Sequence, residues 1–198
     1  FLMLDGFDST DPSDYINGFP WHPHRGIETV TYLLKGEIDH GDSLGNKGVI
    51  GDLQCQWMTA CSGIIHQELP IASERMLGCQ LWVNLPAKDK MTQPAYRDIR
   101  QQDVEVVNEE SATVRVLSGL YKGRHGAVKG EYVKVQYLDV NLKPGSVWTY
   151  NETPNKLKYC VDVNVNTRPL NARLYLWADS LQAKWVWRGW RSRLEVWW

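Results

Sequence analysis

The sequence predicts an all-β protein, a sandwich or barrel of short strands. Segments rich in β-branched and aromatic residues recur at short intervals between turn-forming residues. Helical periodicity is almost absent from the chain. A hydrophobic content of 43% and a charged content of 23% are ordinary for a globular protein. The length of 198 residues admits one large domain or two smaller ones.

Four strands are expected in the first half of the chain. The first ends at Gly36, and a run of turn-forming residues at 43–48 separates it from the second. The third contains a motif with metal-ligating side chains, and the fourth is apolar enough to be buried. The expected strands are residues 28–35, 52–59, 64–69 and 76–85.

A polar stretch, residues 86–110, divides the chain into two halves. The second half contains two further expected strands, 112–118 and 132–142. It contains no pair of histidines, and no histidine and glutamate, at two-residue spacing. We therefore predict two domains, residues 1–100 with a metal site and residues 101–198 without one.

Two short motifs suggest a metal site, His22-Pro23-His24 and His66-Gln67-Glu68. Side chains two residues apart on a strand point to the same face, so each motif can aim two ligands at one point. Two such pairs on neighbouring strands would surround one ion. Three imidazole nitrogens and one carboxylate oxygen suit iron(II), copper, nickel, manganese or zinc better than calcium or magnesium.

The alternative interpretation is that these histidines are unrelated surface or core residues. The second pair argues against it, because two pairs at ligand spacing are less expected by chance than one. The two other histidines have no partner at this spacing. His40 lies in the acidic stretch 37–42 and is interpreted as part of a solvated turn, and His125 as part of a loop.

Charge and composition exclude several function classes. A net charge of −1 gives no general attraction to nucleic acid or to a membrane. No run of eighteen apolar residues and no signal peptide is visible. The chain begins inside an apolar run at Phe1, so we expect the protein's true start to lie upstream. The four cysteines form no C-x-x-C pair, and Cys55 and Cys79 are expected to be core thiols. We expect a cytoplasmic protein, with the nucleus as the alternative in a eukaryote.

The last fifty residues differ in composition from the rest. Seven of the ten tryptophans lie at or beyond Trp148, interleaved with basic residues. We interpret this as a chain end unrelated to the preceding fold, of the kind that a reading-frame error produces. The alternatives are nucleic-acid stacking and a membrane-surface segment.

Several long motifs, in a fixed order, give this sequence a close resemblance to the pirin family of the cupin superfamily. The resemblance covers roughly residues 1 to 150. The matching runs are residues 1–5, 18–26, 28–34, 42–48, 56–60, 63–68 and 80–86.

The resemblance implies a bicupin, two stacked double-stranded β-helix barrels. The second diverges after about residue 150, with a complete and an incomplete barrel as the alternatives. It implies metal in the N-terminal barrel alone, with His22, His24, His66 and Glu68 as the ligands. The ion implied is one Fe(2+) per chain, other divalent transition metals being alternatives. Family members are linked to quercetin 2,3-dioxygenase activity and, in mammals, to nuclear co-regulation of transcription.

Three departures from the family pattern stand out. The family's opening strands should precede Phe1. Cys61 stands where the family has glycine, and we expect a strained backbone there if that position has a positive φ. After Tyr150 no convincing match to the second barrel is found.

Three functions follow as hypotheses. The first is an enzyme that cleaves a flavonol-like substrate with O₂, with Glu68 as the catalytic proton acceptor. The candidates for its pocket wall are Trp21, Trp57 and Met58. The alternative for Trp57 and Met58 is that they belong to the core. Arg25 would orient a ligand or form a surface ion pair. The second hypothesis is a non-enzymatic iron-dependent module that binds a protein partner. The third is a purely structural zinc site.

Overall fold

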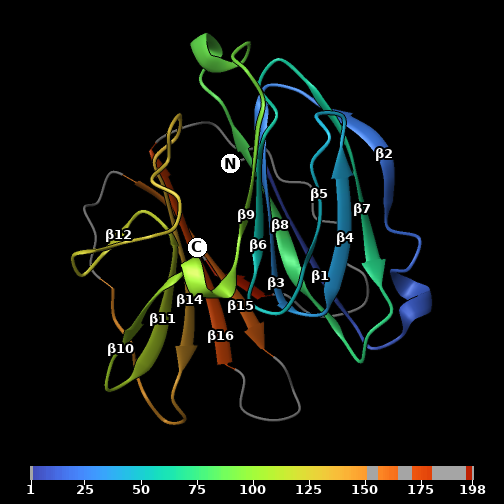
Figure 1. Cartoon of the computed structure of the whole chain (residues 1–198). Coiled ribbons are helices and arrows are strands. Elements are labelled where there is room, and N and C mark those ends of the chain that lie inside the picture. The colour runs from blue at the N-terminus through green and yellow to red at the C-terminus, as the bar shows by residue number, and fades with distance from the viewer. Residues whose placement is uncertain (1, 151–155, 165–170, 180–194, 198) are drawn as a thin grey trace. The chain divides into compact units, whose positions relative to one another are not determined.

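The structure, a computed structural model, describes residues 2–150, 156–164, 171–179 and 195–197, with side chains described for 2–150. Strands joined by turns make up the described residues (Figure 1). Their helical segments are three 3₁₀ turns of three residues each. The predicted all-β class is therefore confirmed. None of the helices in this part of the chain is long and apolar enough to cross a membrane.

The chain divides into two compact units, with the boundary between Gln101 and Gln102. The first unit is built from two antiparallel sheets. One has the strand order β1-β8-β3-β6-β9 and the other β2-β7-β4-β5. The strands are β1 (Met3–Ser9), β2 (Phe19–His24), β3 (Ile27–Lys35), β4 (Glu37–Asp42), β5 (Lys47–Ile50), β6 (Cys55–Thr59), β7 (Ile64–Ile71), β8 (Met76–Asn84) and β9 (Ala95–Ile99).

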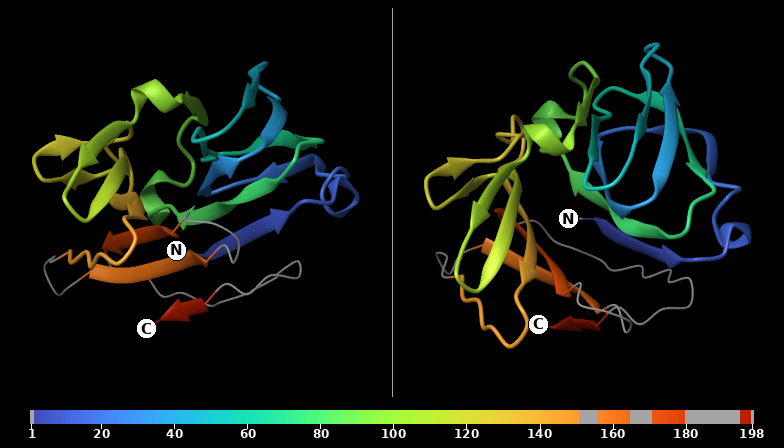
Figure 2. Two further views of the ribbon diagram at one scale, coloured as in Figure 1. Left: turned by 90° about the horizontal axis from the view of Figure 1, so that it is seen from below. Right: turned by 60° about the horizontal axis from the view of Figure 1, so that its bottom comes forward.

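Both sheets of the first unit contribute to a shared apolar core, and Figure 2 shows them opposed. One cluster joins Ile27 and Met58 of the first sheet to Ile64 of the second. Another joins Leu33 to Ile38 and is likewise fully buried. The inward faces of the strands therefore enclose a barrel-like interior, in which polar side chains at selected positions can be kept from water.

The strands expected from composition are found with small differences in their ends. Three of them, 28–35, 64–69 and 76–85, correspond to β3, β7 and β8. The strand expected at 52–59 begins only at Cys55, because Leu53 has φ +59° and belongs to a turn. Strands β1, β4, β5 and β9 were not identified individually as strands from the sequence, and β2 was expected only through its pair of histidines.

Cys61 adopts the strained conformation expected for it. Its φ is +41°, in the left-handed region that favours glycine. The side chain is fully buried, with Sγ 2.9 Å from Thr92 Oγ1. The turn is fixed by backbone bonds from Gly26 to the Cys61 carbonyl and from Gly63 to the Ala60 carbonyl.

The second unit contains a six-stranded sheet of order β10-β11-β14-β16-β15-β17 and a two-stranded sheet, β12-β13. The strands expected at 112–118 and 132–142 correspond to β11 and β14. The interpretation of the chain end as unrelated to the fold concerns residues that lie largely outside the described part. The strands are β10 (Glu105–Asn108), β11 (Ala112–Ser118), β12 (Leu120–Tyr121), β13 (Arg124–His125), β14 (Val135–Leu142), β15 (Lys156–Asn164), β16 (Asn171–Asp179) and β17 (Glu195–Trp197).

Candidate metal centre

The two sequence motifs lie on neighbouring strands. β2 and β7 pair in antiparallel register, with His22 opposite His66 and His24 opposite Ile64. Because side chains alternate along a strand, His22 and His24 share one face of β2, and His66 shares that face on β7. The expectation that the two motifs meet on adjacent strands is therefore confirmed for the three histidines.

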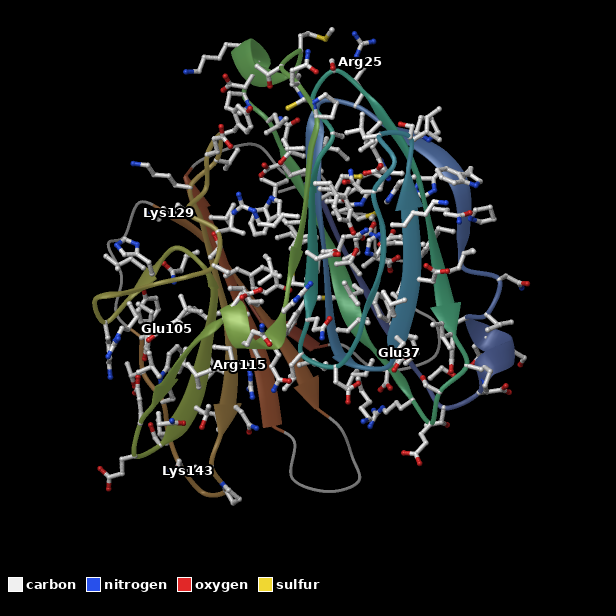
Figure 3. The ribbon with its side chains drawn as sticks, viewed as in Figure 1. Arg25, Glu37, Glu105, Arg115, Lys129 and Lys143 are labelled. Carbon is white, nitrogen blue, oxygen red and sulfur yellow. The ribbon has the colours of Figure 1, made fainter. Side chains whose placement is uncertain are left out.

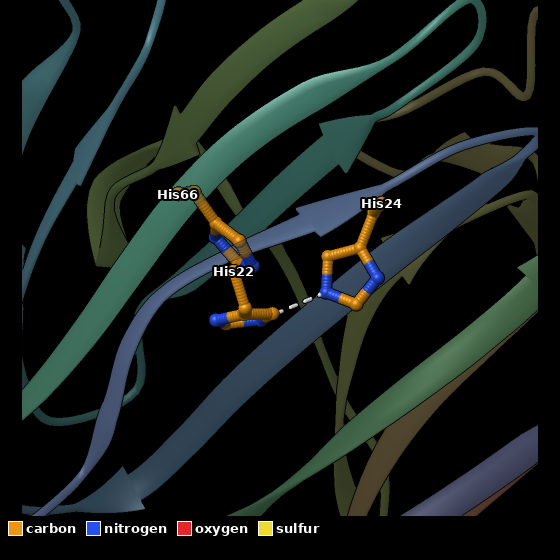
Figure 4. A group of neighbouring side chains, drawn as sticks. All are labelled: His22, His24 and His66. Carbon is orange, nitrogen blue, oxygen red and sulfur yellow. Dashed lines mark hydrogen bonds between the residues drawn. The ribbon is translucent and has the colours of Figure 1, made fainter.

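The three imidazoles form one compact group (Figure 4). One ring nitrogen from each of His22, His24 and His66 can be chosen so that all lie within 4.8 Å of one another. The ring centroids of His22 and His66 are 4.4 Å apart, and those of His24 and His66 are 5.0 Å apart. The Nε2 atoms of His22 and His24 are 3.0 Å apart. Such a group can present three nitrogen lone pairs to a single point.

A backbone carbonyl orients the His22 ring. His22 Nδ1 lies 2.8 Å from the carbonyl oxygen of Pro20. A carbonyl can only accept, so Nδ1 carries the hydrogen and Nε2 is left with its lone pair. Metal-ligating histidines usually donate their second ring nitrogen in this way, which fixes the tautomer and the ring orientation.

His66 carries the most informative feature of the group. It is 1% exposed, and neither of its ring nitrogens has a hydrogen-bond partner among the residues that the structure describes. A buried imidazole without partners is costly unless something else satisfies its nitrogens. Burial, with His22 and His24 nearby, lowers the pKa of His66 to about 3. Burial and His22 likewise lower the pKa of His24 to about 4. Neutral imidazoles with available lone pairs fit a divalent transition metal.

Glu68 stands apart from the three-histidine group. Its side chain is 2% exposed, and each carboxylate oxygen accepts a hydrogen bond. Thr31 Oγ1 donates to Oε1 at 2.7 Å, and Gln80 Nε2 donates to Oε2 at 2.7 Å. The pKa of Glu68 is raised above its ordinary value, because the effect of burial exceeds the lowering effect of these two hydrogen bonds and of nearby histidines. The structure thus brings together three of the four expected ligands and places the fourth in its own hydrogen-bonded setting.

Gln80 links the Glu68 setting to the histidines. The Trp82 indole N–H donates to Gln80 Oε1 at 2.8 Å, which directs the Gln80 amide nitrogen towards Glu68 and Thr31. Trp82 also packs edge-on against His24, with ring centroids 5.0 Å apart. Thr31, Gln80 and Trp82 were missed as site residues from the sequence. The available signal was the two-residue spacing of Gln80 and Trp82, which places both side chains on the same face of β8.

His40 is not in a solvated turn, which corrects the interpretation from the sequence. It lies on β4, opposite Glu68 in the register with β7, and is 2% exposed. The Tyr96 hydroxyl contacts its ring nitrogens at 2.8 Å, and Asp98 Oδ1 lies 3.3 Å from Nε2. The acidic neighbours of His40 concealed an alternating strand whose inward positions include Ile38 and His40. His125 is exposed on the short strand β13.

A cavity of about 470 Å³ lies beside the histidines, and we call it the outer cavity. His22 and His24 line it, together with apolar side chains and, at its rim, Arg25. Arg25 projects from the unit (Figure 3), and its Nη2 lies 3.0 Å from Met91 Sδ. The apolar lining residues are Leu2, Met3, Phe19, Pro23, Ile27 and Trp82.

The three side chains proposed as pocket walls do not line the outer cavity. Trp57 is 4% exposed and Met58 is fully buried, which confirms the alternative that both belong to the core. Trp21 is 54% exposed and points to the opposite face of β2 from His22.

Comparisons with known proteins identify relatives of the chain. A family model described as Pirin matches residues 1–83. A pirin-like protein of Caulobacter vibrioides is 48% identical over 151 residues, which cover 75% of this chain and 55% of that protein. A curated Vibrio cholerae relative is 38% identical over 91% of this chain and 61% of its own length, so that alignment reaches past Tyr150. The chain spans about half the length of the curated relatives it matches.

Solved structures share the fold. The protein GK1651 from Geobacillus kaustophilus is 34% identical with a TM-score of 0.69, covering 81% of this chain and 76% of that one. A quercetin 2,3-dioxygenase from Acinetobacter baumannii is 29% identical with a TM-score of 0.68, covering 82% and 64% of the two chains. A bacterial pirin from Escherichia coli, solved in complex with nickel(II), shares the fold at 20% identity and a TM-score of 0.60, covering 82% and 76%. From these matches and its all-β structure, the chain belongs to the pirin family.

Proposed function

We propose that this chain is a metal-dependent oxidoreductase of the quercetin 2,3-dioxygenase type. In this proposal one iron(II) ion is held by His22, His24, His66 and Glu68. The observation that carries the proposal is His66, which shares a compact group with two other histidines and whose two buried ring nitrogens have no hydrogen-bond partner in the described part of the chain. Three neutral nitrogens and one carboxylate oxygen suit such an ion, whose chemistry when bound is to activate O₂ and to acidify a coordinated hydroxyl group.

The outer cavity is the proposed place for the substrate. Its apolar lining suits a planar aromatic molecule, and His22 and His24 border it on the side of the candidate metal centre. Among the residues that the structure describes, Arg25 forms no ion pair, and its contact with Met91 Sδ leaves the guanidinium able to orient an electron-rich oxygen at the rim. A flavonol combines these features, because its fused rings are flat and its hydroxyl groups are polar.

Glu68 is the proposed proton acceptor. A carboxylate oxygen can accept two hydrogen bonds, so the bonds from Thr31 and Gln80 leave further acceptor capacity on both oxygens. Glu68 does not line the outer cavity, and the flavonol hydroxyl next to the ring carbonyl would reach it beside Gln80, which lines that cavity and donates to Glu68 Oε2. Glu68 would take the proton of that hydroxyl. The two hydrogen bonds hold the carboxylate in place while it does so. In the overall reaction the flavonol and O₂ give the ring-opened ester and carbon monoxide.

Oxygen consumption tests the proposal. The chain, loaded with iron(II) under anaerobic conditions, is mixed with aerated quercetin, and O₂ uptake and carbon monoxide release are measured together. We expect one carbon monoxide per O₂, and at least a hundredfold lower rate in His66→Ala. The control is His125→Ala, which removes an exposed histidine of the second unit and should leave the rate unchanged. Absence of O₂ uptake with every flavonol tested, from chain that holds one metal ion, would overturn the proposal.

A further inference from the structure

The first unit holds a second cavity, of about 160 Å³, which we call the inner cavity. Thr31, Glu68 and Gln80 all line it, and no histidine of the described ranges does. The Glu68 carboxylate is therefore reached from a cavity different from the one that His22 and His24 border. A cavity that ends on a buried, hydrogen-bonded carboxylate is a candidate binding site, because a polar group on the ligand would find a partner there.

Both cavities follow one seam in the barrel. In the strand pairings of the described residues, β1 pairs with β8 alone and β2 pairs with β7 alone, so the edges of β1 and β2 have no ladder between them. The inner cavity takes wall residues from both edges, Phe7 on β1 and Phe19 on β2. The inner and outer cavities share three lining residues, Asp5, Phe19 and Gln80. A ligand lying along the seam would contact both cavities.

Gln80 is the fixed member of this shared border. Its amide is held at both ends, by Trp82 at Oε1 and by Glu68 and Thr31 at Nε2. Phe19, the apolar residue of this border, is 51% exposed, and its ring centroid lies 6.3 Å from that of His22. A ligand that spans the two cavities would pass between Phe19 and Gln80.

The size and the walls of the inner cavity suit one aromatic ring. An engineered apolar cavity of about 150 Å³ in another protein holds a single benzene molecule, and the inner cavity measures about 160 Å³. Its walls are apolar and aromatic, which favours burial of a ring. The wall residues are Phe7, Tyr15, Phe19, Ile38, Pro70 and Met76.

The charges around the inner cavity select for a neutral ring. Among the described residues no lysine, arginine or histidine lines it, whereas Asp5, Asp14, Glu68 and Asp8 do, the last of them in an ion pair with Arg75 at 2.6 Å. A carboxylate-bearing ring would be repelled at short range in a site partly shielded from water. A ring hydroxyl, in contrast, can donate to Glu68 or accept from the Gln80 amide.

We propose that the inner cavity is a binding subsite for one neutral, hydroxylated aromatic ring. If the chain is the oxidoreductase proposed above, this subsite receives the substrate ring that does not react at the candidate metal centre. This assignment of the ring rests on the proposed function. In this arrangement the fused ring system of the proposed flavonol lies in the outer cavity and its single phenolic ring in the inner one.

Binding of phenol and benzoate to the full chain tests the subsite. The two probes have rings of the same size, and benzoate adds a negative charge. We expect phenol to bind at least tenfold more tightly than benzoate by calorimetric titration, with or without bound metal. Backbone amide shifts caused by phenol should centre on Phe7, Ile38 and Met76, which line the inner cavity. Equal affinity for the two probes, or shifts centred elsewhere, would overturn the subsite.

A pair of matched variants tests the effect of filling the inner cavity with a side chain. Ile38→Phe adds a ring at a buried wall position, and Val49→Phe adds the same ring at an exposed position of β5. We expect phenol affinity to fall at least tenfold in Ile38→Phe and to stay unchanged in Val49→Phe. Unchanged phenol binding in a folded Ile38→Phe chain would refute the assignment, and the amide shifts of the unaltered chain decide if that variant does not fold.

The subsite and the proposed function fail in different ways. Phenol binding with no O₂ uptake from any flavonol would leave the subsite standing and overturn the function. O₂ uptake with no phenol binding would support the function and overturn the subsite.

Discussion

His22 on β2 and His66 on β7 occupy opposed positions in the antiparallel register, with ring centroids 4.4 Å apart. This pairing turns two motifs that are distant in the sequence into one compact group. His24 joins the group because it follows His22 by two residues on the same face. The group therefore depends on the register of one strand pair, and a slip of β2 by one residue would turn His22 and His24 to the face opposite from His66.

Removing the hydroxyl of Thr31 should weaken metal binding while the fold remains. Thr31→Val deletes the donor to Glu68 Oε1 and leaves the carboxylate held by Gln80 alone. Outer-shell partners of this kind are worth about 10–100-fold in metal affinity. Competition with a coloured chelator should show at least about a tenfold loss.

The matched control for Thr31→Val is Thr59→Val. Thr59 Oγ1 donates to Glu28 Oε1 at 2.8 Å, a buried pair of the same kind in the same unit and outside the candidate metal centre. Thr31→Val removes two hydrogen bonds, the one to Glu68 and the one from Gln80, whereas Thr59→Val removes one. With each worth about 1 kcal/mol, Thr31→Val should lose about 1 kcal/mol more stability than its control. Equal loss of metal affinity in the two variants would show that Glu68 takes no part in binding the ion.

Acid should destabilise the metal-free chain. Burial lowers the pKa of His66 to about 3 and that of His24 to about 4, whereas the unfolded chain titrates near the ordinary value of 6.5. Between these values the unfolded state binds more protons than the folded state, so the free energy of unfolding falls as the pH falls. Urea unfolding at pH 7 and pH 5 should differ by roughly 2–4 kcal/mol.

Histidine variants test whether the buried histidines cause the acid sensitivity. His66→Gln removes one buried titrating group and should reduce the difference between pH 7 and pH 5 by about half. His125→Gln removes an exposed histidine and should leave the difference as it is. An undiminished difference in His66→Gln would mean that other groups cause the acid sensitivity.

A β-branched residue at position 61 should be poorly tolerated. Cys61 has φ +41°, a conformation that costs non-glycine residues of order 1–3 kcal/mol and β-branched ones the most. Cys61→Val should therefore lower the free energy of unfolding by about 2 kcal/mol more than Cys55→Val, which makes the same change at a buried strand position. Equal losses in urea unfolding would show that the turn accommodates the side chain without strain.

The strands that could be predicted from the sequence are those with long apolar runs. β3 and β8 are buried along most of their length, so β-branched and aromatic residues are frequent in β3 and apolar residues dominate β8. β4 was concealed because its outward positions are acidic or glycine, and the solvated interpretation of His40 followed from them. β2 contains two prolines and was expected as a strand only through its pair of histidines.

Only the candidate ligand side chains of the metal centre could be predicted from the sequence, and their hydrogen-bond partners could not. Two-residue spacing identifies side chains that share a face, and it correctly associated His22, His24 and His66. Spacing along one strand does not reveal what stands on the strand opposite. The hydrogen bonds of Glu68 to Thr31 and Gln80 come from β3 and β8 in the other sheet, and the inner cavity arises from a seam between strands that do not pair.

Metal content of the purified chain is the most direct test of the candidate metal centre. Plasma mass spectrometry of the chain, of His66→Ala and of His125→Ala should be made after loading with iron(II) and removal of the excess. About one metal ion per chain in the unaltered protein and in His125→Ala, with the ion lost in His66→Ala, is the result that the three-histidine group predicts. The same metal content in His66→Ala, or no metal in the unaltered chain, would contradict it.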